Sequence, residues 1–429
     1  MKKNPILLVI VMILAVGVSW AGGNAETEET GIVMKISDNI PDRTVTWGAV
    51  IEQINAEFIQ QHPEVKIETE SYPDQPYQEK IKIYATAGQL PDVMKYWSFS
   101  TLLQPLVESE LVTPLDKADF SDFGWLPGAL ESNMYNGKLY GIPVSGDLWV
   151  IYYNQAILTE CGVEPPETMA DLYDAGAKIS AKGYTPIVTD GKDGWPLSIT
   201  FDNIFWRING DYSLIHAALD GRKPFTDPEF VRAAEEYQKF FLNSGLFGKD
   251  LTTSDYGAAR NLFGQGRAAM YLMGSWELGL ASDTNFPQSF RGNVRAMKFP
   301  VLASGKGKVN DLVAWFGGNY IVNAKTEHMD LAMEYLKLYA KMYPKLIWEQ
   351  QAGFPAQKIS PSADDTAVAK DLLTIAGDAV ATSGTTALDL LTPAFKDSHQ
   401  KLCKDLAAGI ITPLQFCRGL QKAVDEVNK

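Results

Sequence analysis

Alternating apolar and polar positions divide the first hundred residues into short strands and amphipathic helices. The pattern predicts strands at residues 32–36, 65–69 and 91–94, and helices at residues 44–61 and 76–87. A β-α-β-α-β order of this kind is typical of a parallel sheet with helices on its faces. Ligands of such sheets bind at the carboxyl ends of the strands, so the loops after these strands are the first candidates for a site.

The stretch from Gly137 to Asn154 is the most informative apolar segment. Two apolar runs that both resemble strands flank a break at residues 143–146, and Asp147 begins the second run. Because an ionised carboxylate is rarely buried without a partner, we expect Asp147 to face solvent, a polar partner or a ligand. The segment predicts a crossing from one lobe to another, with Asp147 at the floor of the cleft between them.

The same alternation continues to the C-terminus, with no internal repeat and no low-complexity segment. Several helix starts are marked by a hydroxyl residue that is followed, three positions later, by an acidic or amide residue. The pattern predicts strands at residues 184–188 and 268–273 and a return crossing at residues 309–323. Helices are predicted to start near Thr168, Thr226, Tyr256, Glu327 and Thr412. The helix that starts at Glu327 is predicted to end at Lys341.

The length of 429 residues exceeds what one ordinary core accommodates, and this favours two large lobes. The composition is that of a soluble globular protein, with 46% hydrophobic and 21% charged residues. The chain also contains 10 Trp and 18 Tyr residues, which either fill the core or form a surface for a flat, partly polar ligand.

The N-terminus has the features of an export signal. Lys2 and Lys3 precede an apolar run at residues 5–18, and small residues follow it. We therefore expect residues 1–25 to be a cleaved signal peptide, with a retained anchor as the alternative. Because the run is short for a membrane span, cleavage is the favoured interpretation. The mature protein is expected to be periplasmic or otherwise exported, and soluble.

The formal net charge is −14, and removal of Lys2 and Lys3 makes it −14 − 2 = −16. A chain this acidic is expected to be repelled by nucleic acid and by anionic membrane surfaces. No cofactor and no metal site are expected, because the four His and three Cys residues lack metal-ligand spacing. Cys403 and Cys417 either pair in an oxidising compartment or are small buried thiols, and the sequence leaves both interpretations open.

Six short motifs follow one another along the chain. Each motif alone is weak, whereas their order and spacing together are specific. They are FIQQHP at 58–63, AGQLPDV at 87–93, NGKLYGIPVSGDLWVIYYN at 136–154, FGQGRAAMYLMGSW at 263–276, GGNYIVNAK at 317–325 and GFPA at 353–356. In these motifs, which span nearly the whole mature chain, the sequence resembles the extracellular solute-binding proteins of ABC transporters that carry carbohydrates, the maltose-binding-like group.

This resemblance implies an α/β, two-lobed periplasmic-binding-protein fold of type II, in which each lobe is a mostly parallel sheet flanked by helices. It places lobe 1 at residues 31–146 plus about 314–360, and lobe 2 at about 147–313 plus about 361–429. A small-molecule ligand binds in the cleft between the lobes, which close on it. The implied function is delivery of a sugar or oligosaccharide to the permease subunits of an ABC importer by a monomeric protein.

A sugar presents hydroxyl groups and one flat apolar face, so its site needs aromatic side chains together with acidic and amide groups. Trp97 and Trp276 match family positions of stacking aromatic residues. Gly317 and Gly318 allow the backbone to approach a ligand closely. The expected ligand-binding residues are Asp38, Asn39, Trp97, Asp147, Trp195, Trp276, Trp315, Gly317, Gly318, Asn319 and Phe354.

The loop at residues 37–43 departs from the family's pattern, because it contains Pro41 and the charged pair Asp42-Arg43. Which residue of this loop reaches the ligand therefore stays open. Asp38 and Asn39 are the candidates, although they are equally suited to cap the helix that follows. Three further Trp residues fall within helical patterns and are expected in the core: Trp47, Trp206 and Trp348.

Three other functions share parts of this pattern. A binding protein for a polyamine or a polyol phosphate has the same fold, and an adhesin or sensory protein uses it without transport. An exported carbohydrate-active enzyme needs two carboxylates roughly 5–9 Å apart. Nothing in the sequence marks such a pair, and no G-x-S-x-G, P-loop or H-E-x-x-H motif occurs. We therefore expect no catalytic residue and no enzyme activity.

Overall fold

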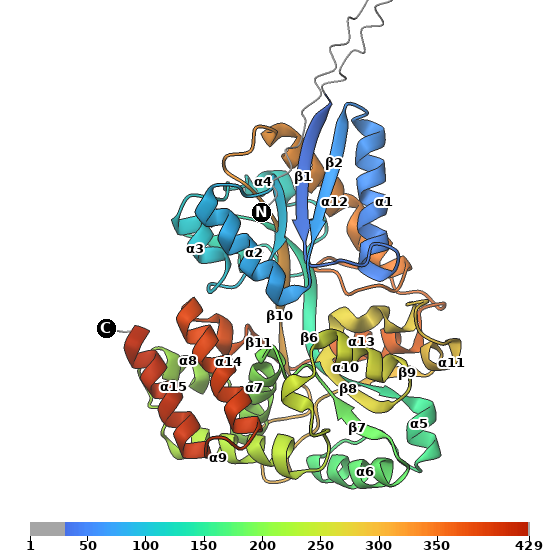
Figure 1. Ribbon diagram of the computed structural model, residues 1–429, viewed down its shortest axis with the longest axis vertical. Coiled ribbons are helices and arrows are strands. Elements are labelled where there is room, and N and C mark those ends of the chain that lie inside the picture. Colours follow the sequence, from blue (N-terminus) through green and yellow to red (C-terminus); the bar gives the residue numbers. More distant parts are fainter. Residues whose placement is uncertain (1–30, 428–429) are drawn as a thin grey trace, which may run out of the picture.

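Two α/β halves lie end to end in the computed structural model, which describes residues 31–427 (Figure 1). The predicted signal peptide at residues 1–25 lies outside the described part. Two long strands, β6 (Ile142–Asn154) and β10 (Asp311–Val322), run through both halves and join them. We call the half that holds the first strands the N-terminal half, and the other the C-terminal half.

One sheet passes through both halves in the strand order β2-β1-β3-β10-β6-β8-β7, with β11 beside β10 and β9 beside β6. β1 pairs parallel with β2 and with β3, which confirms the parallel arrangement predicted for the first three strands. β10 runs antiparallel to both β3 and β6. The remaining strands are β1 (Ile32–Asp38), β2 (Val65–Ser71), β3 (Val93–Tyr96), β7 (Thr185–Val188), β8 (Ala268–Gly274), β9 (Val294–Met297), β11 (Ala381–Gly384), and a separate hairpin of β4 (Met134–Tyr135) and β5 (Lys138–Leu139).

Helices cover both faces of the sheet in the N-terminal half. Apolar residues of α1 recur at helical spacing, and Val50, Ile54 and Phe58 pack against the long helix α12 and the sheet. On the other face, Tyr77 and Leu103 belong to a smaller core under α2 and α3. The helices of this half are α1 (Thr46–Gln61), α2 (Asp74–Ala87), α3 (Leu103–Glu108), α4 (Lys117–Phe120) and α12 (Met329–Glu349), with a 3-10 turn at Glu131–Asn133.

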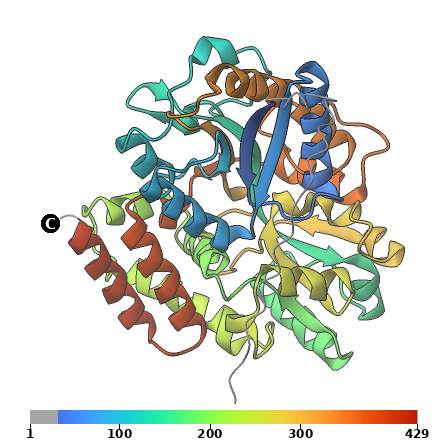
Figure 2. The ribbon, with the colours of Figure 1, turned by 45° about the horizontal axis from the view of Figure 1, so that its top comes forward.

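The C-terminal half holds the larger core, which β6, β8 and α7 share with the C-terminal helices. Figure 2 shows α14 and α15 side by side along one edge of this half. Its helices are α5 (Gln155–Glu160), α6 (Met169–Ala181), α7 (Trp195–Asn209), α8 (Ser213–Leu219), α9 (Pro228–Gln238), α10 (Tyr256–Gly264), α11 (Gln288–Arg291), α13 (Ala367–Gly377), α14 (Pro393–Ala407) and α15 (Pro413–Val427), with a π-helical turn at Lys239–Asn243 and 3-10 turns at Leu251–Thr253, Ser275–Ala281 and Ala387–Asp389.

The predicted break at residues 143–146 is wrong, because β6 continues through it as one strand. Pairing with β10 holds this segment extended, and the amide of Gly146 also donates to the carbonyl of Phe354 at 3.2 Å. Hydrogen bonds from β10 and to the Phe354 carbonyl thus override the local turn preference of Ser145-Gly146. The crossing itself is as predicted.

The helix predicted to end at Lys341 continues to Glu349 and passes through Pro344. Proline in a helix leaves the carbonyl four residues earlier without its usual donor. Here that carbonyl, on Ala340, accepts a hydrogen bond from Nε2 of Gln357 at 2.7 Å. A side chain distant in sequence therefore supplies the missing donor and allows the helix to continue.

Two of the three predicted helix caps are confirmed. Thr168 and Asp171 form a capping box at the start of α6, and Thr412 and Gln415 exchange equivalent hydrogen bonds before α15. The cap predicted at Thr226 is wrong: Asp227 occupies the cap position, and its side chain makes no cap hydrogen bond. The carboxylate instead pairs with Lys223 at 2.7 Å.

All three cysteines are free and buried, so Cys403 and Cys417 form no disulfide. Burial raises the pKa of the Cys417 thiol to about 12 and keeps both thiols protonated. Within residues 31–427, no helix is long and apolar enough to cross a membrane. The same described range contains no group of three or more His, Cys, Asp or Glu residues arranged to hold a metal ion.

Candidate functional site

Asp147 lies on β6 at the level where the two halves meet, opposite Trp315 on β10. Its side chain is 6% exposed, and Oδ1 has no hydrogen-bond partner among the described residues. Burial raises the pKa of Asp147 to about 7, against the opposing effects of the Ser145 hydroxyl and the charge of Lys95. An unpartnered acceptor this deeply buried is costly unless a ligand or water satisfies it.

Gly317 provides the space for this carboxylate. A Cβ atom at Gly317 would lie 1.8 Å from Oδ2 of Asp147 and 3.0 Å from Nε1 of Trp315. The backbone of β10 therefore approaches Asp147 more closely than any side chain would permit.

We expect Gly317→Ala to displace the Asp147 side chain, to weaken ligand binding, and to lower the free energy of unfolding by about 1–3 kcal/mol through overpacking. Thermal denaturation and calorimetric titration measure the two effects. Gly377→Ala is the matched control, because a Cβ atom there meets nothing within 4 Å. Equal unfolding temperatures for the two variants would show that Asp147 does not depend on this space.

Four tryptophans from different elements gather beside Asp147, and we call them the tryptophan cluster. Trp149 and Trp315 come from the two joining strands, Trp195 is the first residue of α7, and Trp276 follows β8. The ring centre of Trp276 lies 6.1 Å from that of Trp149, 5.8 Å from that of Trp195 and 6.0 Å from that of Trp315. Nε1 of Trp149 and Nε1 of Trp195 are buried without a hydrogen-bond partner. The cluster thus combines aromatic rings, those of Trp195 and Trp276 being partly exposed, with unsatisfied donors.

On the side of the N-terminal half, the central residue is Lys95 at the end of β3. Its buried Nζ donates to Oδ1 of Asn39 at 2.7 Å and lies 4.9 Å and 5.6 Å from the ring centres of Trp47 and Trp97. Burial lowers the pKa of Lys95, while the charges of Asp38 and two other carboxylates oppose the shift. Neither Lys95 nor Trp47 was predicted for this position, and Trp47 was expected in the core.

Asp38 has a complete set of partners within the protein. Oδ2 pairs with Arg43 at 2.7 Å, and Oδ1 accepts hydrogen bonds from the amide of Ile40 and the hydroxyl of Ser71. The side chain is fully buried. These contacts explain how the loop that contains Arg43 is held, and they leave Asn39 as the more accessible of the two candidates in this loop.

The remaining predicted residues divide into two groups. Trp97 is half-buried against Tyr77 and Tyr96, and Gly318 has a φ of +62° with a Cβ position 3.7 Å from Nζ of Lys95. The other group lies deeper in the protein: Asn319 is fully buried and donates to Asn133, and Phe354 packs edge-on against Trp348. The structure therefore gathers Asp147, Trp195, Trp276, Trp315 and Gly317 in one cluster and Asn39, Trp97 and Gly318 in another around Lys95.

Contacts between the halves occur on both flanks of these clusters. On one flank, the hydroxyl of Thr101 donates to Oδ1 of Asp389 at 3.3 Å, and Nζ of Lys396 lies 5.9 Å from the ring centre of Phe99. On the other flank, Nδ2 of Asn285 lies 3.4 Å from Oδ2 of Asp42. The two clusters therefore lie in the region where the halves meet, and contacts between the halves occur on both sides of it.

Two further carboxylates, Asp190 and Asp74, were not predicted. Asp190 follows β7 and is fully buried, and Oδ2 has no hydrogen-bond partner among residues 31–427. Asp74 is the first residue of α2. Burial raises the pKa of Asp190 to about 8 and that of Asp74 to about 6. Asp190 follows a predicted strand, and ligands of such sheets bind at the carboxyl ends of strands. The argument that made Asp38 a candidate therefore applies equally to Asp190.

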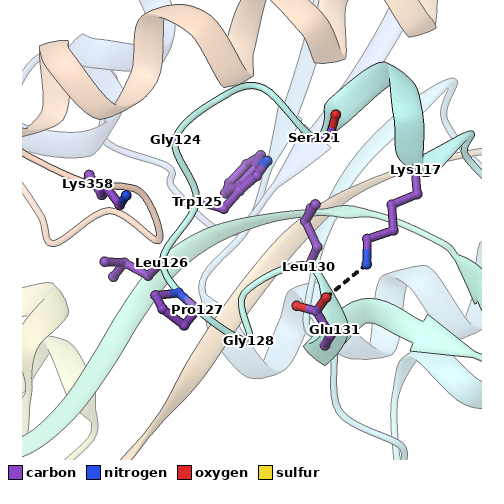
Figure 3. Close-up of a pocket in the computed structure, with 10 residues that line it drawn as sticks. All are labelled: Lys117, Ser121, Gly124, Trp125, Leu126, Pro127, Gly128, Leu130, Glu131 and Lys358. Atoms are coloured by element: carbon purple, nitrogen blue, oxygen red, sulfur yellow. Dashed lines mark hydrogen bonds and ion pairs between the residues drawn. The ribbon is translucent and has the colours of Figure 1, made fainter.

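A surface pocket of about 560 Å³ lies away from this cleft, in front of Trp125 (Figure 3). Two of its lining residues, Leu126 and Gly128, approach the face of β6 and β10 that carries Gly146 and Phe316. Side chains alternate along a strand, so this is the face opposite Asp147. Several of its polar groups are already paired: Lys117 with Glu131 at 2.8 Å, and Nε1 of Trp125 with the carbonyl of Phe120. The pocket therefore offers less to a polar ligand than the cleft does.

Comparison with known proteins gives a consistent result. The sequence profile of a family described as bacterial extracellular solute-binding protein matches residues 41–342. An uncharacterized ABC transporter extracellular-binding protein of Pyrococcus horikoshii is 26% identical over 299 residues, which are 66% of this chain and 69% of the relative. The galactooligosaccharide-binding protein of Bacillus subtilis is 26% identical over 335 residues, which are 75% of this chain and 72% of the relative.

A solved structure agrees with these matches over almost the whole length. It comes from a study of xylan utilization by the thermophilic bacterium Caldanaerobius polysaccharolyticus. The two chains are 28% identical and superpose with a TM-score of 0.82, and the match covers 91% of this chain and 99% of the other.

Proposed function

Because the chain belongs to the bacterial extracellular solute-binding proteins and has their two-lobed type II periplasmic-binding-protein fold, we propose that it binds a sugar or oligosaccharide in the cleft between its halves. One observation carries the proposal. Buried polar atoms without partners lie in a cluster of four tryptophans, of which Trp195 and Trp276 are partly exposed. These atoms include Oδ1 of Asp147 and Nε1 of Trp149. A ligand with hydroxyl groups and a flat apolar face satisfies both features.

The proposed lobes are residues 31–146 plus about 314–360, and about 147–313 plus about 361–429. The division of the hydrophobic core supports these boundaries. Along β6, Val144 belongs to the core of the N-terminal half and Leu148 to that of the C-terminal half. Along β10, Ala314 belongs to the core of the C-terminal half and Tyr320 to that of the N-terminal half. The strands therefore pass from one core to the other between Val144 and Leu148 on β6 and between Trp315 and Tyr320 on β10.

We expect a bound sugar to bring the lobes together and to reduce the radius of gyration in solution. A ligand favours the closed state only if it contacts both lobes, and the cleft offers Asp147 and the tryptophan cluster on one side and Lys95 with Trp97 on the other. Small-angle X-ray scattering with and without a saturating sugar measures the change. A sugar that leaves the unfolding temperature unchanged is the control. Identical profiles with a confirmed ligand would contradict closure.

The proposed role is delivery of the ligand to the permease subunits of an ABC importer by an exported, soluble protein. Binding requires no bond to break, and we propose no enzymatic step. The proposal of a monomer that does not bind nucleic acid stays a prediction.

A thermal-shift screen over oligosaccharides, polyamines and polyol phosphates tests the proposed ligand class. A ligand that binds the folded state raises the unfolding temperature by mass action. We expect a rise with at least one neutral oligosaccharide. A rise with polyamines alone would replace the sugar by a cationic ligand, an alternative that the carboxylates of Asp74, Asp147 and Asp190 favour over a polyol phosphate.

A further inference from the structure

The turn after β8 holds the ring of Trp276 against the backbone. The pairing of β8 with β6 ends at Gly274 and Trp149, and the chain then enters the 3-10 turn at Ser275–Ala281. A Cβ atom at Gly274 would lie 2.0 Å from Cζ3 of Trp276, so the indole ring folds back over this glycine. The position of the turn relative to β6 therefore sets the position of the ring.

Two hydroxyl groups fasten this turn to β6. The buried hydroxyl of Ser275 accepts a hydrogen bond from the amide of Leu148 at 3.0 Å and donates one to the carbonyl of Gly146 at 3.3 Å. The hydroxyl of Tyr152 donates to the carbonyl of Gly274 at 3.0 Å. Since Gly146 and Leu148 flank Asp147 in the chain, Ser275 bridges the backbone of β6 across this residue.

β6 changes its hydrogen-bond partner at this point. On the side of the C-terminal half it pairs with β8, up to Trp149. On the side of the N-terminal half, the amide of Gly146 donates to the carbonyl of Phe354 at 3.2 Å. Ser275 lies between these two partners and contacts the part of the strand that passes from one core to the other.

On the basis of the proposed function, we propose that Ser275 is a positioning residue that couples Trp276 to the bending of β6. A hydroxyl group both donates and accepts, and it rotates to suit its partners, so Ser275 keeps both hydrogen bonds while the direction of the strand changes. A sugar that stacks on Trp276 therefore acts on the strand at Asp147. Without the hydroxyl group, the buried amide of Leu148 loses its partner, and the turn shifts together with the ring.

Calorimetric titration tests the inference. The probes are maltotriose, raffinose and xylotriose, and the one that the wild type binds most tightly is used for all variants. Ser275→Ala is expected to weaken its binding roughly tenfold, the effect of leaving a buried group without its hydrogen bond. Tyr152 still holds the turn, so the variant is expected to fold.

The Trp276→Ala background separates positioning of the ring from general support of the fold. Because Ser275 acts through the ring, adding Ser275→Ala to Trp276→Ala is expected to change the dissociation constant by less than about twofold. A residue that only supports the fold weakens binding by the same factor in both backgrounds. An equal loss in both backgrounds would therefore overturn the inference.

Ser244→Ala is the matched control. The Ser244 hydroxyl also accepts from a backbone amide, that of Leu246 at 3.1 Å, and donates to a backbone carbonyl, that of Phe240 at 2.5 Å. It follows the π-helical turn at Lys239–Asn243 and lies outside the tryptophan cluster. Its loss is expected to leave the affinity within about twofold, because no ring of the cluster depends on it.

Near-ultraviolet circular dichroism tests the position of the ring without any sugar. The signal reports the fixed packing of aromatic side chains, and the ring centre of Trp276 lies within 6.1 Å of those of Trp149, Trp195 and Trp315. Ser275→Ala is expected to change this spectrum and to leave the far-ultraviolet spectrum unchanged, whereas Ser244→Ala changes neither. A near-ultraviolet spectrum identical to that of the wild type would show that Ser275 does not position the ring.

Tyr152→Phe provides a second variant if Ser275→Ala does not fold, because it removes the other bond to the turn and retains the aromatic ring. Weaker binding that again disappears in the Trp276→Ala background is expected, and an additive loss would count against the coupling. If the wild type binds none of the three sugars, the proposed function fails and the coupling with it. That result differs from an equal loss in both backgrounds.

Discussion

Replacement of Trp276 by alanine is expected to weaken sugar binding roughly tenfold or more, because a stacking aromatic residue is a common energetic centre of a binding site. Trp276 is the only member of the tryptophan cluster whose ring lies within about 6 Å of all three others, at 6.1, 5.8 and 6.0 Å. Its loss removes the middle of the apolar surface. Calorimetric titration with the best sugar from the screen gives the change in dissociation constant.

Trp125→Ala is the matched control for this variant. Trp125 is also half-buried and also lies near the joining strands, but it faces the pocket on the opposite side (Figure 3). Its removal is expected to leave the affinity within about twofold, because the ring does not face the cleft. Far-ultraviolet circular dichroism checks that both variants are folded. Equal affinities of the two folded variants would remove Trp276 from the site.

Replacement of Arg207 by alanine is expected to lower the free energy of unfolding by about 3–5 kcal/mol, because it leaves several buried carbonyl groups without a donor. The Arg207 side chain is 1% exposed. Its guanidinium donates to the carbonyls of Lys308 at 2.7 Å, Asp311 at 2.8 Å and Phe299 at 3.0 Å. These bonds fasten the segment between β9 and β10 to α7, and with it the start of a joining strand.

Urea denaturation monitored by tryptophan fluorescence measures this loss of stability. Arg232→Ala is the control, because Arg232 is exposed and donates to Ser304 in the same segment. A surface contact of this kind contributes little, and a change within about 0.5 kcal/mol is expected. If both variants unfold at the same urea concentration, Arg207 is not the anchor of this segment.

The sequence alone determined the elements whose causes are local. The capping boxes before α6 and α15 and the first parallel strands follow from residue spacing, and the structure contains them. The apolar run at residues 137–154 likewise marked the crossing at Asp147. Resemblance in six short motifs predicted the fold class, which the matching structure confirms.

The tertiary structure decided where long-range contacts compete with local preference. Residues 143–146 favour a turn in isolation, but pairing with β10 makes them strand. Pro344 ends helices by its own chemistry, but Gln357 supplies a hydrogen bond to Ala340 that lets α12 continue. Neither partner is near in sequence, so no local pattern contains the information.

In the candidate site, too, some features follow from local sequence and others from long-range contacts. Residue type and position nominated Asp147, Trp195, Trp315 and Gly317, the family resemblance nominated Trp276, and the structure places them together. The sequence also nominated Asp38, yet only the structure shows that Arg43 and Ser71 already satisfy it. Asp190 was not predicted. Asp38 and Asp190 both follow strands, and only their hydrogen-bond partners distinguish a satisfied carboxylate from an unsatisfied one. The order of residues fixes which polar groups are available, and folding fixes which of them are buried without a hydrogen-bond partner. That difference depends on contacts between segments far apart in the chain.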